Sequence, residues 1–176
     1  MNQQEPNPDH TPPQGEIQSR YPDGTIKAVG RLTGELREGP WIWYFQNGNT
    51  WASGGYHEGI KQGPWTFWYE NGQEDCQGQY LDGCKTGTWD YWYPSGQLDC
   101  RGSYVAGLED GPWTSWYEDG TKQEEGYYRA GRKVGAWDLW TEDGTHQTEE
   151  FDDIDGANAP ASPESTPTKH DTTEPT

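Results

Sequence analysis

The side chains that could carry out catalytic chemistry do not form a recognisable set in this sequence. The four histidines, His10, His57, His146 and His170, share no common spacing, and none suggests a triad with a serine or cysteine nucleophile. Adjacent carboxylates occur, but neighbouring residues of a strand point to opposite faces, so such pairs do not converge on one substrate. The sequence therefore predicts no catalytic residue and a protein that is not an enzyme.

Metal and cofactor sites are equally poorly supported. The odd number and wide spacing of Cys76, Cys84 and Cys100 fit neither a disulfide framework nor a zinc site, so reduced thiols are expected. The acidic segment 152–156 is similar to a calcium loop, but Phe151 occupies its first ligand position. No metal ion and no cofactor are expected.

What the sequence offers instead is aromatic rings and glycines at a fixed spacing of 24 residues. The chain has 11 Trp, 11 Tyr and 24 Gly. One tryptophan series comprises Trp41, Trp65, Trp89, Trp113 and Trp137. A second ring series comprises Tyr44, Trp68, Trp92, Trp116 and Trp140. One of the glycine series comprises Gly30, Gly54, Gly78, Gly102 and Gly126. Such a period predicts a repeat array rather than one globular core.

Each 24-residue unit is predicted to be a β-hairpin. Its first half is rich in aromatic and β-branched residues, which suit a strand. Asn71-Gly72 indicates a two-residue type I′ turn, and Asp82-Gly83 indicates the return turn to the next unit. The predicted fold is all-β, an elongated single-layer antiparallel meander of about five to six hairpin repeats.

The two-residue turn sets the expected register of the hairpin. Trp65 is expected opposite Gly78, where its ring would cover the bare backbone of the glycine, and Gly63 is expected opposite Tyr80. On this basis the first tryptophan series and the glycine series named above are assigned structural roles.

The second ring series, here called the Trp row (Tyr44, Trp68, Trp92, Trp116 and Trp140), is the predicted partner-binding site. Alternation along the strands places Trp68 on one face with Thr66, Asp75 and Gln77, which are polar. Aligned, exposed indoles are a common means of gripping a partner. The alternative is that these rings only cover the second face of the sheet, and the sequence leaves both interpretations open.

The two ends of the chain differ from the repeat region at residues 15–151. Residues 1–14 are polar and residues 152–176 are acidic and rich in Pro and Thr, so both are predicted to be disordered tails. The formal charge of −18 disfavours nucleic acid and anionic lipid as partners. The sequence shows no apolar run of membrane-spanning length and no signal peptide, so a cytoplasmic location is expected.

The unit Gly-x-Trp-x-x-Trp-Tyr-x-Asn-Gly, followed by Gly-x-Tyr-x-x-Gly, resembles the MORN-repeat family and in particular its bacterial variant. The resemblance covers residues 15–151 and implies an elongated sheet of hairpins that acts as an interaction scaffold, without shared catalytic residues. Some bacterial relatives carry an antitoxin label, and some eukaryotic members associate with membranes or phosphoinositides. The membrane property transfers poorly, because Glu109 interrupts the only recurring basic series, Arg37, Lys61, Lys85 and Lys133.

Three classes of partner follow from these observations. The leading hypothesis is a non-enzymatic scaffold that binds another protein, with an antitoxin-like role, and a toxin as partner, as its narrower form. The second hypothesis is carbohydrate or cell-wall binding through the stacked rings, which also suit choline. The third is association with a membrane surface. No nucleic-acid partner is expected.

Overall fold

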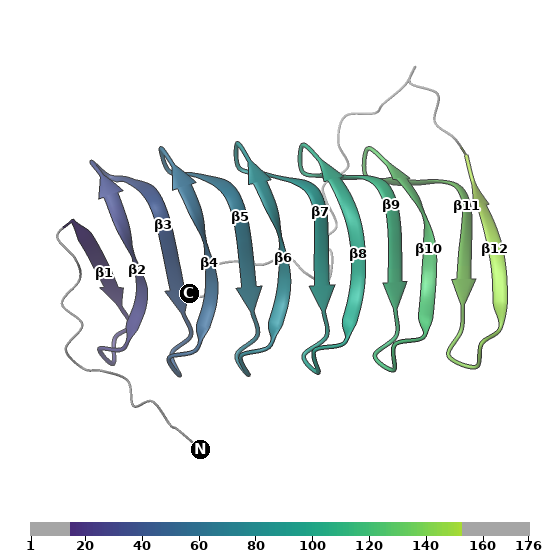
Figure 1. Cartoon of the computed structure of the whole chain (residues 1–176), viewed down its shortest axis with the longest axis horizontal. Coiled ribbons are helices and arrows are strands. Elements are labelled where there is room, and N and C mark those ends of the chain that lie inside the picture. Colours follow the sequence, from purple (N-terminus) through teal and green to yellow (C-terminus); the bar gives the residue numbers. More distant parts are fainter. Residues whose placement is uncertain (1–14, 153–176) are drawn as a thin grey trace.

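A computed structural model describes residues 15–152 of the chain. The predicted disordered tails lie outside the described residues, apart from Asp152. The described residues form one sheet of twelve strands (Figure 1). The strands are β1 (Glu16–Arg20), β2 (Ile26–Thr33), β3 (Leu36–Tyr44), β4 (Thr50–His57), β5 (Ile60–Trp68), β6 (Glu74–Leu81), β7 (Cys84–Trp92), β8 (Leu98–Val105), β9 (Leu108–Trp116), β10 (Lys122–Arg129), β11 (Arg132–Trp140) and β12 (His146–Phe151).

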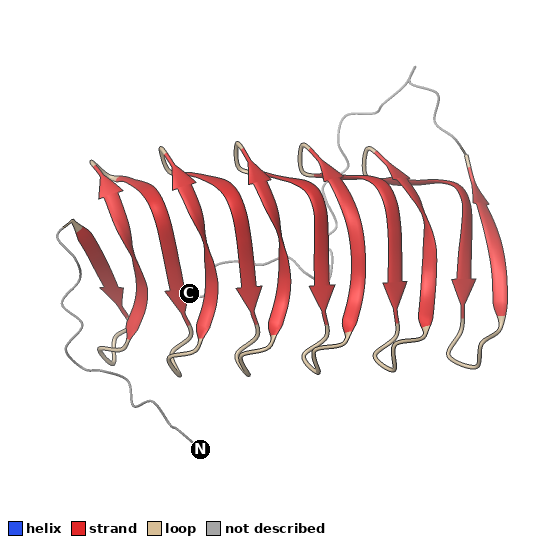
Figure 2. Ribbon diagram, viewed as in Figure 1, coloured by secondary structure: helices blue, strands red, loops and turns tan. Residues whose placement is uncertain are grey.

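The strands lie in the sheet in the order in which they follow one another in the chain. Neighbours pair antiparallel from β1–β2 through to β11–β12, so the sheet is a meander without crossovers. Strands and the loops between them account for the whole of residues 15–152 (Figure 2). The predicted all-β meander of hairpin repeats is thus confirmed.

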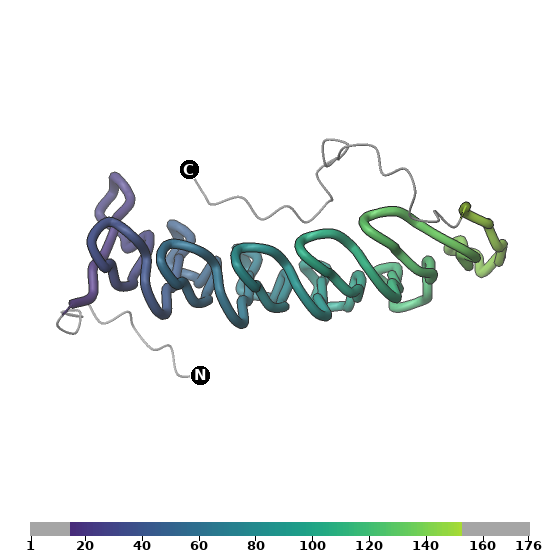
Figure 3. The backbone as a smooth tube through the Cα atoms, turned by 90° about the horizontal axis from the view of Figure 1, so that it is seen from above, coloured from purple at the N-terminus to yellow at the C-terminus, as the bar shows by residue number. Residues whose placement is uncertain are grey.

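The single-layer sheet is bent across its strands. Seen from above, the chain makes one coil-like loop in each repeat (Figure 3). The bend coincides with a β-bulge: Gly54 and Gly55 of β4 pair with Trp65 and Gln62 of β5, which leaves two residues of β5 unpaired with β4. Bulges of this kind increase local twist and bend the strand that carries them. The bend curls the sheet around one of its faces.

Gly63, one of the two extra residues, serves this bend. Its φ of 74° lies in the left-handed region, and a Cβ added to it would meet nothing within 4 Å. Gly63 does pair with Tyr80, as predicted. The glycine is explained by its backbone conformation, however, because no ring covers it.

Four of the five return turns are type I′, including Asp82-Gly83, as its sequence indicates; in the first, Gly34-Glu35, only Gly34 has a positive φ. Asp82 and Gly83 have φ values of 50° and 81°, and the flanking Leu81 and Cys84 pair directly. Two consecutive residues with positive φ define this turn type and match the twist of the flanking strands. The return turn therefore joins β6 to β7 without a loop.

The turn at the other end of the hairpin differs from the prediction. Gly72 has a φ of 87°, but Asn71 does not have a positive φ, so the predicted two-residue type I′ turn is wrong. The loop contains the three residues Glu70–Gly72 and is closed by hydrogen bonds of 2.9 Å from Tyr69 N–H to the Gln73 carbonyl and from Gly72 N–H to the Tyr69 carbonyl. The Asn71 side chain accepts the Gln73 N–H at 2.9 Å, which stabilises this alternative conformation.

The longer loop leads into a second bulge, which moves one acidic side chain. Cys76 and Glu74 both pair with β5, and Asp75 between them is the extra residue of the bulge. A bulge re-aims the side chain of the extra residue. Trp51, which occupies the position of Asp75 one repeat earlier, is buried within the core. The predicted place of Asp75 beside Trp68 is therefore wrong, since this position faces the core.

The core is a continuous ladder of rings on the inner face of the bent sheet. Trp65 and Trp89 are 2% and 0% exposed, and Phe67 is 0% exposed. Neighbouring rings alternate between stacking, as for Trp65 and Phe67 (centroids 5.6 Å apart, 24°), and edge contacts, as for Tyr80 and Trp89 (5.2 Å, 87°). Both geometries are favourable for aromatic pairs. The rings bury one another along the array, which replaces the missing aliphatic core. We call this the ring ladder.

Each tryptophan of the first series lies over a glycine of the preceding strand. A Cβ added at Gly54 would overlap the indole of Trp65. The same overlap occurs for the pairs Gly30–Trp41, Gly78–Trp89, Gly102–Trp113 and Gly126–Trp137. The prediction that Trp65 covers Gly78 is wrong, although these residues do pair. The indole Nε1 of Trp65 donates to the Gly55 carbonyl at 3.1 Å, which holds the ring over β4.

A third ring series connects neighbouring repeats through hydroxyl groups. Tyrosine Oη donates to a backbone carbonyl 23 residues later in the pairs Tyr21–Tyr44 (2.7 Å), Tyr69–Trp92 (2.7 Å), Tyr93–Trp116 (2.9 Å) and Tyr117–Trp140 (2.8 Å). Burial, followed by the charge of Asp99, raises the pKa of Tyr93 to about 12, so its hydroxyl remains a donor at neutral pH. Phe45 occupies the same position in its repeat and has no hydroxyl to donate.

Replacing Gly54 by alanine should destabilise the array, because the new methyl group would overlap the Trp65 ring. We expect a loss of about 1–3 kcal/mol in the free energy of unfolding, the usual range for overpacking. Denaturant unfolding followed by circular dichroism measures it. Ser53→Ala, at the neighbouring position, is the control and should change stability by less than about 0.5 kcal/mol. Equal midpoints for Gly54→Ala and the wild type would contradict the assigned packing.

Tyr117→Phe should lower stability by about 1 kcal/mol through loss of one hydrogen bond to a backbone carbonyl. Phe45→Tyr is the reciprocal change and should raise stability by a similar amount, because its hydroxyl would reach the carbonyl of Trp68. Thermal unfolding of the two variants beside the wild type tests both signs. The interpretation fails if the two substitutions shift the midpoint in the same direction.

Candidate interaction surface

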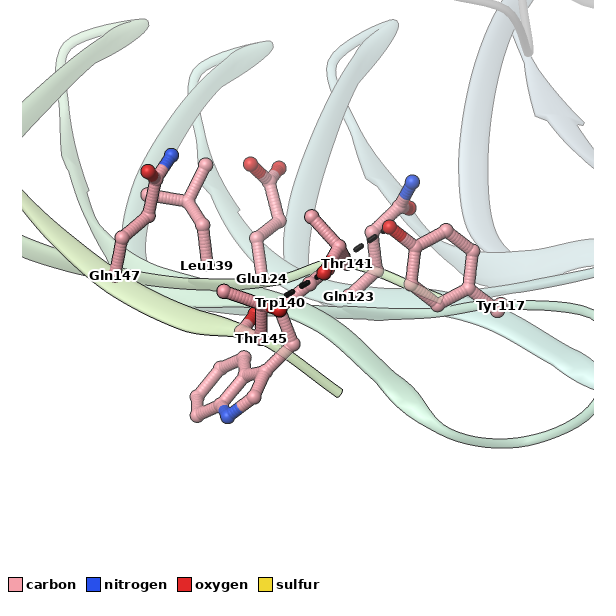
Figure 4. Close-up of a pocket in the computed structure, with 8 residues that line it drawn as sticks. All are labelled: Tyr117, Gln123, Glu124, Leu139, Trp140, Thr141, Thr145 and Gln147. Carbon is pink, nitrogen blue, oxygen red and sulfur yellow. Dashed lines mark hydrogen bonds between the residues drawn. The ribbon is translucent and has the colours of Figure 1, made fainter. Parts of the chain in front are cut away.

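The Trp row lies at the ends of alternate strands, because its members are the last residues of β3, β5, β7, β9 and β11. All five side chains are half-buried. Side chains alternate along a strand, so Trp68 faces away from the buried Phe67 and Trp65. Figure 4 shows the same arrangement at the last repeat, where the indole of Trp140 points away from Leu139. The row therefore lies on the face opposite the ring ladder.

The rings of the Trp row stand apart from one another. Within residues 15–152 they make no ring contacts among themselves. Trp140 is partly covered, since His146 lies over it at 4.9 Å between centroids and the Lys122 Nζ lies 5.0 Å from its ring. Trp68, Trp92 and Trp116 have no such cover from the described residues. These three indoles make no ring or cation contact within residues 15–152.

The backbone beneath the row is held by the tyrosine hydroxyls. The carbonyls of Trp92 and Trp116 accept hydrogen bonds from Tyr69 and Tyr93 of the preceding repeat. The positions of the indoles are thus set by the sheet and by bonds between repeats. A binding surface that is rigid before it meets its partner loses less conformational entropy on association.

Charged groups around the Trp row are engaged with one another. Arg101 pairs with Asp90, and Asp138 accepts hydrogen bonds from Thr148 at 2.7 Å and interacts with His146 at 2.9 Å. The hydrogen bond from Thr148, followed by that from His146, lowers the pKa of Asp138. Paired charges thus lie two residues before Trp92 and Trp140 on their strands.

The recurring basic residues lie on the other face of the sheet. Lys61 Nζ lies 4.5 Å from the ring centroid of Trp65 and 4.9 Å from that of Tyr80. Arg37, Lys85 and Lys133 cover the rings of their own repeats in the same way. These cations take part in cation–π contacts with the ring ladder.

An exposed apolar series at the return turns was missed by the sequence analysis. Its members, here called the turn ridge, are Leu36 (51% exposed), Ile60 (49%), Leu81 (54%), Val105 (58%) and Leu108 (49%), with the exposed Cys84. Leu36, Ile60, Cys84 and Leu108 recur every 24 residues, and this spacing could have revealed the series. It passed unnoticed because its members are of different types and the aromatic series dominate the repeat.

A hollow of about 330 Å³ lies near the last repeat (Figure 4). Its lining residues are Tyr117, Gln123, Glu124, Leu139, Trp140, Thr141, Thr145 and Gln147. Leu139 occupies the position that Phe67 and Tyr91 hold in earlier repeats, so the ring ladder thins out here. Among residues 15–152 no group of three potential metal ligands is found, and the three cysteines form no disulfide there.

Comparison with known proteins bears on the repeat itself. The family model of the MORN repeat variant matches four consecutive segments, residues 37–57, 61–82, 85–106 and 109–130. No curated protein matches the chain. In the described part of the chain, no helix is long and apolar enough to cross a membrane.

The units that flank the matched segments share their geometry. Tyr21 bonds forward to Tyr44, and Trp137 covers Gly126, as their equivalents do inside the matched region. The sequence match and the structure therefore both show an array of hairpins with the variant repeat at its centre. The chain belongs to the MORN-repeat family and is a repeat scaffold.

Proposed function

We propose that this scaffold is not an enzyme and that it binds another protein through the Trp row. The observation that carries the proposal is the set of three half-buried indoles, Trp68, Trp92 and Trp116, on one sheet face, where tyrosine hydroxyls hold the backbone of Trp92 and Trp116. Aromatic rings within a rim of paired charges are typical of protein interfaces. Tryptophan is also enriched among the residues that dominate binding energy.

The charges around the row support binding rather than catalysis. A general acid or base must be free to exchange a proton with a substrate. Asp90 is paired with Arg101, and Asp138 is engaged by Thr148 and His146. These side chains are engaged in ion pairs and hydrogen bonds with one another, and they form a polar rim beside the indoles.

A membrane surface is a less suitable partner. Anionic lipid is recognised by exposed clusters of basic residues. Arg37, Lys61, Lys85 and Lys133 are instead engaged with the ring ladder, and the whole chain carries a formal charge of −18. Neutralisation of a toxin is a narrower form of the proposal, and a complex with a toxin encoded beside this gene would support it.

Simultaneous replacement of Trp68, Trp92 and Trp116 by alanine should weaken binding of the partner by at least roughly tenfold, because large rings dominate such interfaces. The partner is first captured from the native organism and identified, and its affinity is then measured by titration calorimetry with purified proteins. The β-sheet circular dichroism spectrum of the variant should match that of the wild type, because the row lies outside the ring ladder.

The turn ridge provides the matched control. Replacing Leu81, Val105 and Leu108 by serine also removes three exposed apolar side chains, but on the return turns, and should leave the affinity unchanged. Loss of binding in the ridge variant with full binding in the tryptophan variant would overturn the proposal. A glycan panel followed by Trp fluorescence, or flotation with anionic liposomes, would overturn it by showing saturable binding that depends on the Trp row.

A further inference from the structure

The series of basic residues over the ring ladder is interrupted in one repeat. Numbered by the matched family segments, the third repeat is residues 85–106 and the fourth, where the interruption lies, is residues 109–130. In the third repeat Lys85 Nζ lies 4.6 Å from the ring centroid of Trp89 and 5.4 Å from that of Tyr104, and it donates to Tyr91 Oη at 3.0 Å. Glu109 stands 24 residues after Lys85, at the equivalent position. The fourth repeat thus has a carboxylate where its neighbours have an ammonium group.

The rings that would receive a cation are nevertheless retained. Trp113 meets Tyr128 edge-on, with centroids 5.4 Å apart at 72°, and meets Tyr104 at 5.9 Å and 72°. These values are close to those of the lysine-filled third repeat, where Trp89 and Tyr104 lie 6.3 Å apart at 74°. Ser115 replaces the second ring that the three preceding repeats carry. The fourth repeat therefore keeps two rings of the site, Trp113 and Tyr128, and lacks the third.

Trp113 also differs from the other tryptophans of its series. It is half-buried, whereas Trp41, Trp65, Trp89 and Trp137 are all buried. Those four indoles donate from Nε1 to a carbonyl of the preceding strand, but Trp113 makes no such bond within residues 15–152. Its six-membered ring, rather than the junction of its two rings, lies nearest to Gly102. The surface of Trp113 is thus more open than that of its equivalents.

The charge at this site is not balanced by the chain itself. Glu124 pairs with Lys133 at 2.6 Å, but Glu109 has no cationic partner among residues 15–152. Burial, followed by the charges of Glu124 and Glu109, raises the pKa of Tyr128, in keeping with carboxylates beside the rings. In the next repeat the cation position is half-buried, since the Lys133 side chain is 26% exposed. Ring faces and an uncompensated carboxylate together attract an organic cation.

We propose that the fourth repeat binds an alkylammonium group, namely a lysine side chain of another polypeptide, over the rings of Trp113 and Tyr128. The incoming lysine would take the place that Lys61, Lys85 and Lys133 fill in their own repeats, and Glu109 would pair with its charge. The site lies on the ring-ladder face, so it is a second contact, independent of the Trp row and of the function proposed for it.

The test uses the full chain labelled with ¹⁵N at the indoles. Trp113→Phe identifies the Trp113 signal. The probe is Nα-acetyl-lysine methylamide, which should shift that signal saturably, while the Nε-acetylated form, without the charge, should not. Glu109→Gln should weaken the affinity for the probe roughly fivefold, whereas Glu118→Gln, an equal charge change on an exposed turn, should not.

Glu109→Lys supplies the decisive variant. Its own lysine should fill the site, abolish the response to the probe and raise the thermal unfolding midpoint. The proposal is overturned if the probe leaves the Trp113 signal unmoved in the wild type, or moves it equally in Glu109→Lys. Tighter binding of choline than of the capped lysine would overturn the assignment to a lysine side chain. None of these outcomes depends on Trp68, Trp92 or Trp116, so the Trp-row proposal is judged separately.

Discussion

The contact on which this structure depends is the indole laid over a bare glycine of the preceding strand. A single-layer sheet has no second layer to bury its apolar face, so each ring must be covered by other parts of the same repeat and its neighbours. Gly54 allows Trp65 to lie against the backbone, the Nε1 bond to Gly55 fixes the ring there, and Lys61 covers its outer side. With that contact repeated along the array, flat rings bury one another nearly completely.

Much of the fold follows from the sequence because its period is so regular. The meander and the return turn at Asp82-Gly83 are predictable from strand alternation and turn residues. The pairs Trp65–Gly78 and Gly63–Tyr80 also match the prediction, because the extra residue Asp75 offsets the longer loop and restores the register. The positions of the Trp row on the outer face follow from the same alternation. These features depend only on local geometry that recurs in every unit.

The features that the sequence did not predict occur where the same residues suit two local structures almost equally well. Asn71 suits either a type I′ turn or the three-residue loop, and its own bond to Gln73 decides the matter. That choice adds the bulge that moves Asp75 to the core side. Likewise Trp65 has a glycine on each neighbouring strand, and its ring lies over the one beside the bulge, where the Gly55 carbonyl accepts its Nε1–H. At the candidate sites, the exposure of Trp113 required the packing of three consecutive repeats to be known.

The indole–glycine contact also makes the array directional. Each glycine is covered by the tryptophan eleven residues later, so the packing unit runs from Gly54 through the return turn to Trp65. The matched family segments end at residue 57 and resume at residue 61, which divides this packing unit in two. Duplicating or deleting a whole period of 24 residues preserves every indole–glycine contact, even when the cuts fall between the matched segments. A truncation between two matched segments breaks one of these contacts. Removing the carboxyl-terminal part leaves a glycine uncovered, whereas removing the amino-terminal part leaves a tryptophan without the glycine on which it packs.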